Sequence, residues 1–336
     1  MAVLKAVKDF LVHAFKYPKP FNWGYPVFFG SCGLIFAVFL SKLMFAGAFP
    51  FSSTSLIGCA VIVLLLVMAA FLVPSVLMAE KGGLDITGRY TGIGALILAF
   101  LSGAPLYLIK AAFHNFALAF WLKNGGSVIF PAIFYHLDEI NGLTLFLSIL
   151  IDTIVPAFGI SFFFLGAVWQ GFSEKRKRWA FIVIPLLIAL YSFDFIDLPA
   201  ILIIGWWLCI VRSRTENIYG PVLVLLGARF TGILIGSVVV EIDLTTVRTY
   251  SDIPTPFYYS SIPAIVVAVI LFAFFRKTLG EFHNAYSNDV YGDPRLPAEK
   301  DGGKANKLYK GFNLTLVLGI AICVIFWILL FKGARI

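Results

Sequence analysis

Nine long apolar runs constrain the fold of this chain more than any other feature of its sequence. Most of them approach the roughly 20 residues that an α-helix needs to cross about 30 Å of hydrocarbon. Of the 336 residues, 60% are apolar and only 13% are charged, and a water-soluble fold of this length could not bury so much apolar surface. We therefore predict an all-α, polytopic transmembrane helical bundle with about nine spans. The runs lie near residues 27–49, 55–78, 91–109, 143–172, 179–193, 197–211, 218–239, 260–275 and 312–331.

Basic residues between the runs alternate from one side of the bundle to the other, as the positive-inside rule requires. The segment 175–178 consists of lysines and arginines, whereas the charged residues of the segments 194–197 and 240–258 are mainly acidic. Lys110 and Lys123 are exceptions, because they fall in a segment assigned to the acidic side. The alternation predicts a multi-pass protein of the cell membrane with a cytoplasmic N-terminus and a C-terminus outside.

Other segments divide the chain further. Residues 1–24 alternate apolar and basic positions, which predicts an interfacial amphipathic helix on the membrane surface. Within the transmembrane bundle at 25–280, residues 110–142 are rich in aromatic side chains, and we expect them to form an interfacial or re-entrant segment. Residues 281–311 are hydrophilic and predict a cytoplasmic loop before the last transmembrane helix and short tail at 312–336.

Residues that often bind metals or form disulfides are scattered along the chain. The four cysteines lie in separate apolar runs without a CxxC pair, and the four histidines form no HExxH or HxxxH pattern. We therefore expect no metal and no cofactor. The net charge of +8 indicates orientation and contact with anionic membrane lipids rather than binding of nucleic acid.

Charged side chains within the apolar runs are costly at membrane depth and are therefore candidates for function. Asp152 lies in the fourth run and Arg229 in the seventh. Asp194 and Asp197 form an acidic pair between the fifth and sixth runs, close enough to the surface to be hydrated. Lys42 in the first run can snorkel to the surface, and we expect it to be structural. One interpretation is an interhelical ion pair of Arg229 with an aspartate, and the other is a polar pocket for a ligand headgroup or a partner's helix. We expect no histidine near the aspartates, so a set of groups for hydrolysis is incomplete.

The order of several short motifs between residues 143 and 240 is informative. Residues 160–172 read ISFFFLGAVWQGF, a basic turn and Trp-Ala follow, and residues 211–221 read VRSRTENIYGP. This order resembles the CPBP family, the intramembrane glutamate proteases that include CAAX prenyl proteases and bacteriocin-immunity proteins. Family members read approximately EExxFRG, then a basic turn, Trp-Ala, FxxxH, an Arg-Thr-Gly turn and, as the last motif, a Pro-Ile-Leu-x-His-x-x-x-Asn helix. The retained anchors are Phe164, Gly166, Trp179, Ala180, Phe193, Arg214, Thr215 and Pro221.

The resemblance also implies that the catalytic groups of the family are missing. Ile160 and Ser161 stand at the positions of the two family glutamates. Asp197 stands at the FxxxH histidine, and Leu225 and Arg229 stand at the histidine and asparagine of the last motif. In the family the glutamate activates water and the other groups assist, so the resemblance implies a degenerate member that kept the helical bundle.

These observations favour a non-catalytic membrane protein over an enzyme, and no catalytic residue is predicted. We expect a scaffold, regulator or subunit that binds another membrane protein or a lipid-linked ligand. The candidate polar pocket comprises Asp152, Ser161, Asp194, Asp197 and Arg229. Two alternatives stay open, namely an active intramembrane protease with unconventional residues and a transporter.

Overall fold

The structure is a computed structural model that describes residues 24–45, 53–82, 86–88, 91–129, 153–170, 172, 177–239, 241–244, 246–291 and 314–331. Among these residues the regular structure is helical, apart from an isolated bridge between Gly88 and Asn217. Each predicted apolar run is helical over most of its described residues, which confirms the all-α class. The α-helices are α2 (Gly24–Phe45), α3 (Ser53–Gly82), α4 (Ile93–Leu101), α5 (Gly103–Lys123), α7 (Val155–Ile160), α8 (Lys177–Ser192), α9 (Leu198–Thr215), α10 (Tyr219–Ile235), α11 (Phe257–Tyr291) and α12 (Leu314–Phe331). A π-helix, η2 (Ser161–Val168), follows α7, and a short 3-10 helix, η4 (Tyr250–Asp252), precedes α11.

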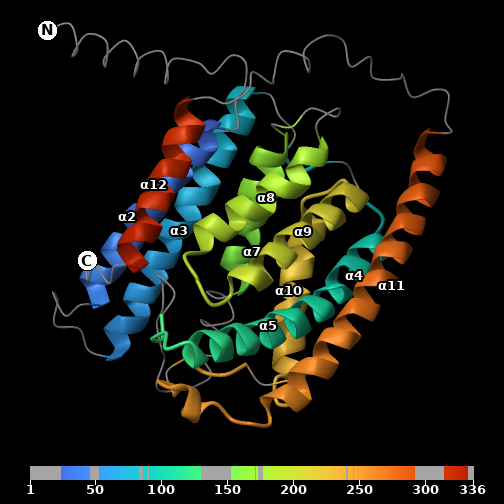
Figure 1. Cartoon of the computed structure of the whole chain (residues 1–336). Helices are drawn as coiled ribbons and strands as arrows, with labels where there is room; N and C mark the ends of the chain where they lie inside the picture. The colour runs from blue at the N-terminus through green and yellow to red at the C-terminus, as the bar shows by residue number, and fades with distance from the viewer. Residues whose placement is uncertain are drawn as a thin grey trace, which may run out of the picture.

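The helices form a bundle in which distant parts of the chain become neighbours (Figure 1). α2 packs against both α3 and α12, so helices from the two ends of the sequence lie side by side. α8 and α9 pack against each other, as expected for a tight helical hairpin, and η2 packs against α3. α10 packs on α4 and α5, and α11 covers α5 at the edge of the bundle opposite α2 (Figure 1).

Some of the described helices are long and apolar enough to span a membrane, namely Ile93–Lys123, Leu198–Thr215 and Phe257–Asn284, and other apolar helices are shorter. Only 22% of an 18-residue apolar stretch of Phe257–Asn284 is buried inside the bundle, whereas 50% of the corresponding stretch is buried in each of the other two helices. Apolar side chains such as Val269 and Ile270 are therefore exposed on α11. A helical surface of this kind is stable in contact with lipid, where each helix satisfies its own backbone hydrogen bonds.

A close crossing of α4 and α5 with α10 shapes the centre of the bundle. At the break between α4 and α5, the hydroxyl of Ser102 accepts a hydrogen bond of 3.2 Å from the buried indole of Trp207. A Cβ on Gly103 would come within 2.3 Å of the α10 backbone, and one on Gly227 within 1.8 Å of the α4 backbone. Only glycine allows the backbones to approach so closely, and small residues serve this purpose in many membrane bundles.

Two predicted segments begin within helices. α5 continues as a regular helix to Lys123, within a stretch long enough to span a membrane and past residue 110, where the re-entrant or interfacial segment was predicted to begin, and the membrane depth of residues 110–123 stays a prediction. The physical reason for the continued helix is that α11 packs along α5 and covers it. α11 itself continues to Tyr291, past residue 281, where the hydrophilic loop was predicted to begin. The predicted amphipathic helix at residues 1–23 lies outside the described residues.

Candidate functional site

One face of α5 carries polar side chains on an otherwise apolar helix. Tyr107, Lys110, His114 and Asn115 are spaced as on one side of an α-helix. Each of them bonds to a segment that connects two other helices. We call these four side chains the α5 polar face. It joins the α8–α9 connection (residues 193–197) to the α10–α11 connection (residues 236–256).

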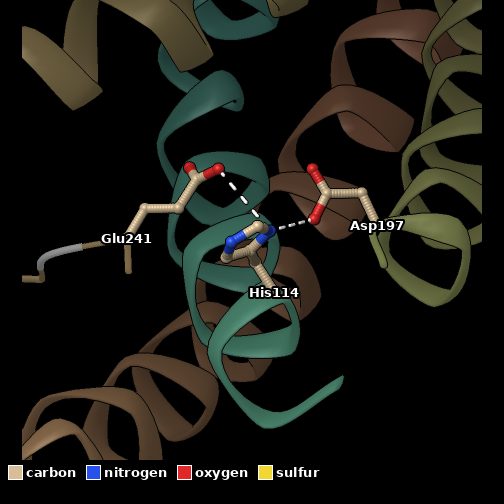
Figure 2. A group of neighbouring side chains, drawn as sticks. All are labelled: His114, Asp197 and Glu241. Atoms are coloured by element: carbon tan, nitrogen blue, oxygen red, sulfur yellow. Dashed lines mark hydrogen bonds and ion pairs between the residues drawn. The ribbon is translucent and has the colours of Figure 1, made fainter. Parts of the chain in front are cut away.

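His114 lies at the centre of the α5 polar face, between Asp197 and Glu241 (Figure 2). Its Nδ1 atom is 2.6 Å from Asp197 Oδ1 and 3.8 Å from Glu241 Oε1. Its Nε2 atom is 3.0 Å from the carbonyl oxygen of Ile242. The side chains of His114 and Asp197 are only 4% and 5% exposed, so these bonds are shielded from water. His114 therefore bridges the two connections inside the bundle.

Lys110 lies beside both carboxylates of this cluster. Its Nζ atom is 3.0 Å from Glu241 Oε1 and 3.4 Å from Asp197 Oδ2. Lys110 and Glu241 are each partly exposed, so this half of the cluster reaches the surface. Two carboxylates therefore neutralise the charge of Lys110. The two acidic segments predicted to share one side of the membrane thus meet at one end of the bundle, and which side that is stays a prediction.

The short α8–α9 connection holds Asp197 in place for this contact. Phe193 has a φ of 47°, in the left-handed region, and turns the chain after α8. The backbone N–H of Asp197 donates to Asp194 Oδ1 at 3.1 Å. The Asp197 side chain makes no capping bond to α9 and instead binds His114.

The two aspartates of this connection differ in their ionisation. Burial opposes the charged form of Asp197, but the Lys110 ammonium and the hydrogen bond from His114 lower its pKa below the usual range. For Asp194, burial and the charge of Asp197 raise the pKa to about 6. The connection therefore holds one firmly ionised carboxylate and one that takes up a proton near neutral pH.

The remaining side chains of the α5 polar face hold the α10–α11 connection. Asn115 Oδ1 accepts from the N–H of Ile242 at 2.9 Å, and Asn115 Nδ2 donates to Ser261 of α11 at 3.1 Å. The hydroxyl of Tyr107 donates to the carbonyl oxygen of Val239 at 2.9 Å. Backbone groups that follow α10 are thus satisfied by side chains of α5, which fixes the start of the connection.

A cavity of about 520 Å³ lies against this connection. Glu241 and Ile242, which the α5 polar face holds, form part of its wall, and Val247, Asp252 and Phe257 form other parts. Cavities of this size with a few polar groups are typical of small-molecule or peptide sites. The charge cluster and the cavity therefore share the first residues of the α10–α11 connection.

Among the described residues, His114, Asp197 and Glu241 have ligand atoms within 4.8 Å of one another, close enough to consider a metal ion. The 2.6 Å between His114 Nδ1 and Asp197 Oδ1 is a hydrogen-bond distance. Two ligands of a tetrahedral ion with bonds of about 2.0 Å are separated by roughly 3.3 Å. The Lys110 ammonium also already supplies a positive charge to both carboxylates. The geometry fits an ion-pair network rather than a metal site.

The helices between α7 and α10 form the centre of the bundle and supply Asp197 to the cluster. Residues 142–230 match a protein-family model described as Type II CAAX prenyl endopeptidase Rce1-like. This segment is similar to the Rce1-like family. The match confirms the resemblance inferred from the motifs and supports a membrane fold of the intramembrane-protease type. No curated protein and no solved structure matches the chain.

The Rce1-like segment (residues 142–230) contains the anchors on which the resemblance rests, and most of them are buried. A side chain at Gly166 would clash, because its Cβ would come within 2.1 Å of Ile86. The segment contributes Asp197 to the charge cluster, whereas Lys110 and His114 precede the segment and Glu241 follows it. The cluster is therefore assembled around the border of the Rce1-like segment.

The residues of the predicted pocket occupy different environments. The structure brings Asp194 and Asp197 together. Ser161 begins η2, is fully buried, and its hydroxyl has no hydrogen-bond partner among the described residues. Arg229 lies on an exposed side of α10, close enough to Tyr107 for its charge to act on that hydroxyl. Asp152 lies outside the described residues, so its pairing with Arg229 stays a prediction.

The expectation that no histidine lies near the aspartates is wrong, because His114 binds Asp197 from a position 83 residues earlier in the chain. The sequence held one signal of this contact. Lys110, His114 and Asn115 recur at helical spacing in a segment that is otherwise apolar. A re-entrant or interfacial segment at 110–142 would have placed these side chains near the membrane surface, where polar residues are common, so their helical spacing did not indicate a buried site.

Proposed function

We propose that this chain is a non-catalytic multi-pass membrane protein that uses a protease-type bundle to bind another membrane protein or a lipid-linked ligand. The burial of Ser161 and its lack of a hydrogen-bond partner among the described residues are the main observation that supports the proposal. Ser161 stands where the resemblance has a water-activating glutamate, yet its hydroxyl is fully buried and unpartnered among the described residues. Activation of water needs a base within hydrogen-bond reach. No described acid or histidine lies that close to this hydroxyl.

The other replaced positions support the same proposal. Asp197, at the place of a family histidine, has its carboxylate engaged by His114 and Lys110. Leu225 and Arg229 replace the remaining histidine and asparagine, and neither can act as a base at neutral pH. A bundle that has lost these groups can still present a shaped surface within the membrane. We place it in a cell membrane with a cytoplasmic N-terminus, on the alternation of basic residues.

The α10–α11 connection is the surface we propose for the partner. It holds the cavity of about 520 Å³. Tyr250 in this connection and Tyr258 and Tyr259 at the start of α11 are exposed, Tyr259 to 85%. Tyrosine is favoured both at protein interfaces and at the boundary between lipid and water, because it combines an apolar ring with a polar tip. A partner that docks at this end of the bundle would bury these rings.

The test separates binding from catalysis. The purified chain in lipid nanodiscs should not cleave a prenylated CAAX peptide, and a stoichiometric membrane partner should co-purify in mild detergent. Replacing Tyr250 and Tyr259 by alanine should release that partner, whereas Val266→Ala, on the exposed apolar side of α11, should retain it. Cleavage of the peptide by the wild-type chain would refute the non-catalytic proposal. Retention of the partner by the double tyrosine variant would refute the proposed surface.

A second candidate function rests on Glu241. Its side chain is 33% exposed, forms part of the cavity wall, and lies 3.8 Å from His114 Nδ1. A carboxylate beside a histidine at a cavity is an arrangement that hydrolases use. If the chain does cleave a membrane substrate, Glu241→Gln should abolish the cleavage, and unchanged cleavage would remove Glu241 from the mechanism. Both carboxylate oxygens of Glu241 already accept hydrogen bonds from the Lys110 ammonium, so we favour the first function.

A further inference from the structure

The hydrogen bonds of His114 define where its protons are. Nε2 faces the carbonyl oxygen of Ile242 at 3.0 Å, and a carbonyl oxygen carries no proton, so Nε2 must donate. Nδ1 faces Asp197 Oδ1 at 2.6 Å. One proton must therefore lie between Nδ1 and the carboxylate, either on the ring or on Asp197. A neutral ring against an ionised carboxylate would place two lone pairs face to face.

The neighbouring charges decide which of the two groups holds that proton. Lys110 Nζ lies 3.4 Å from the other oxygen of Asp197 and favours the ionised carboxylate. Glu241 Oε1, 3.8 Å from Nδ1, favours a positive ring. Asp194, in the same connection as Asp197, adds to the negative potential whenever it is ionised. From α10, Arg229 acts on Tyr107 at the far end of the polar face, and from α11 the polar group that faces Asn115 is the neutral Ser261.

We propose that His114 is a buried proton-binding site, held as an imidazolium between Asp197 and the carbonyl of Ile242, and that its proton fastens the α8–α9 connection to the α10–α11 connection. The charges of these four side chains then balance, since Lys110 and His114 are positive and Asp197 and Glu241 are negative, and Asp194 favours the positive ring further when it is ionised. Paired charges of this kind avoid the cost of an unpaired buried ion. The proposal does not depend on whether the bundle is catalytic.

Loss of this proton has a structural consequence. The lone pair of Nδ1 would face the carboxylate of Asp197 at 2.6 Å, and the repulsion would separate the two groups. His114 could then keep its bond to Ile242 only while releasing Asp197. Because Glu241 and Ile242 form part of the cavity wall, the shape of the cavity would follow the protonation of His114. The ligand that this site binds is thus a proton, and the shape of the cavity depends on whether that proton is bound.

The proton itself can be observed by nitrogen NMR. The full chain, labelled with ¹⁵N-histidine and reconstituted in nanodiscs, is compared with His114→Gln to assign the ring signals of His114. Near pH 7 both ring nitrogens should carry hydrogen, and one should lose it as the pH is raised. In Asp197→Asn the ring should be neutral at the same pH, because the asparagine amide can donate to Nδ1 and no carboxylate favours the proton. A ring of wild-type His114 that is neutral near pH 7 would overturn the proposal.

How firmly His114 holds the α10–α11 connection can be measured by trypsin cleavage after Arg248, an exposed residue of that connection. Rates are divided by those of a peptide with the same sequence, which removes the pH dependence of the protease. Wild-type cleavage should rise about tenfold once the imidazolium is lost, the effect of roughly one charge-assisted hydrogen bond. Asp197→Asn should be cleaved slowly at every pH, because a neutral His114 still bridges Asn and Ile242.

The remaining outcomes decide between a proton-dependent contact and a merely structural one. Lys123→Gln changes a charge on α5 outside the cluster and should keep the wild-type profile. If Asp197→Asn is less stable or cleaved faster to the same extent at every pH, Asp197 has a structural role only and the proposal is overturned. The same holds if Asp197→Asn shows the wild-type rise with pH. Size-exclusion elution and thermal unfolding of each variant exclude a general loss of fold.

Discussion

Two buried polar side chains in this bundle, Ser161 and His114, differ in whether their polar atoms have hydrogen-bond partners. Ser161 lies inside the Rce1-like segment, fully buried, and its hydroxyl has no partner among the described residues. His114 lies outside that segment, almost as deeply buried, and both of its ring nitrogens are hydrogen-bonded. Burial alone therefore does not identify the site. The charged cluster lies at the border of the Rce1-like segment, whereas the position that matters in the resemblance holds a buried hydroxyl without a partner among the described residues.

The difference follows from what each group costs when it is buried. A neutral hydroxyl without a partner costs about 1–3 kcal/mol, which a large bundle tolerates. A charged group without a partner costs several times more, so buried charges persist only with opposite charges and hydrogen bonds. Lys110, His114, Asp197 and Glu241 meet this condition together. The Ser161 hydroxyl is neutral and has no hydrogen-bond partner among the described residues.

Ser161→Glu should give the largest effect, because it places a carboxylate at a fully buried position whose present hydroxyl has no partner among the described residues. We expect the free energy of unfolding to fall by about 3–5 kcal/mol, the usual cost of an uncompensated buried charge. Thermal and denaturant unfolding in detergent measure the change. Ser161→Gln adds the same volume without the charge and separates the steric part, and Ser161→Ala should be close to neutral.

The result also tests the comparison between the two positions. If Ser161→Glu unfolds within about 1 kcal/mol of Ser161→Gln, water reaches residue 161, because only hydration would compensate the charge. The position would then be a wet cavity like a protease site, and the non-catalytic proposal would lose the observation that carries it.

Asp194→Asn should give a smaller effect that depends on pH. Burial and the charge of Asp197 raise the pKa of Asp194 from 3.8 to about 6 in the folded chain. A raised pKa of an acid means that its stabilising contribution is complete below pH 4 and is lost as the pH rises through about 6. Asparagine stays neutral and can still accept the N–H of Asp197, so the variant should become more stable than the wild type between pH 4 and pH 7.

Thermal unfolding midpoints of Asp194→Asn and wild type, measured at intervals across that range, give the difference directly. Other titrating groups are common to both chains and cancel. A difference that does not change with pH would show that Asp194 is hydrated. The acidic pair would then not be part of the buried cluster.

The sequence predicts the helices better than it predicts the site. Apolar runs report burial in lipid or protein, so their existence and approximate bounds follow from composition alone. The motifs around Phe164 and Gly166 likewise predict the Rce1-like segment, because local spacing is visible in one sequence. The contact of His114 with Asp197 joins residues far apart in the chain, and it depends on how α5 is placed against the α8–α9 connection. No local pattern encodes that placement.

The smallest expected effect concerns the partly exposed half of the cluster. A double-mutant cycle of Lys110→Met and Glu241→Gln should give a coupling energy of about 0.5–1 kcal/mol, since water screens a pair at the surface. The Lys277–Glu281 pair, 3.9 Å apart and 81% and 65% exposed, is a control within the same chain. Its coupling should be too small to measure. Lys110→Met alone should cost more than Glu241→Gln alone, because Lys110 also pairs with the buried Asp197. Equal coupling at both pairs would mean that Lys110 is solvated, and Asp197 would then depend on His114 for its charge balance.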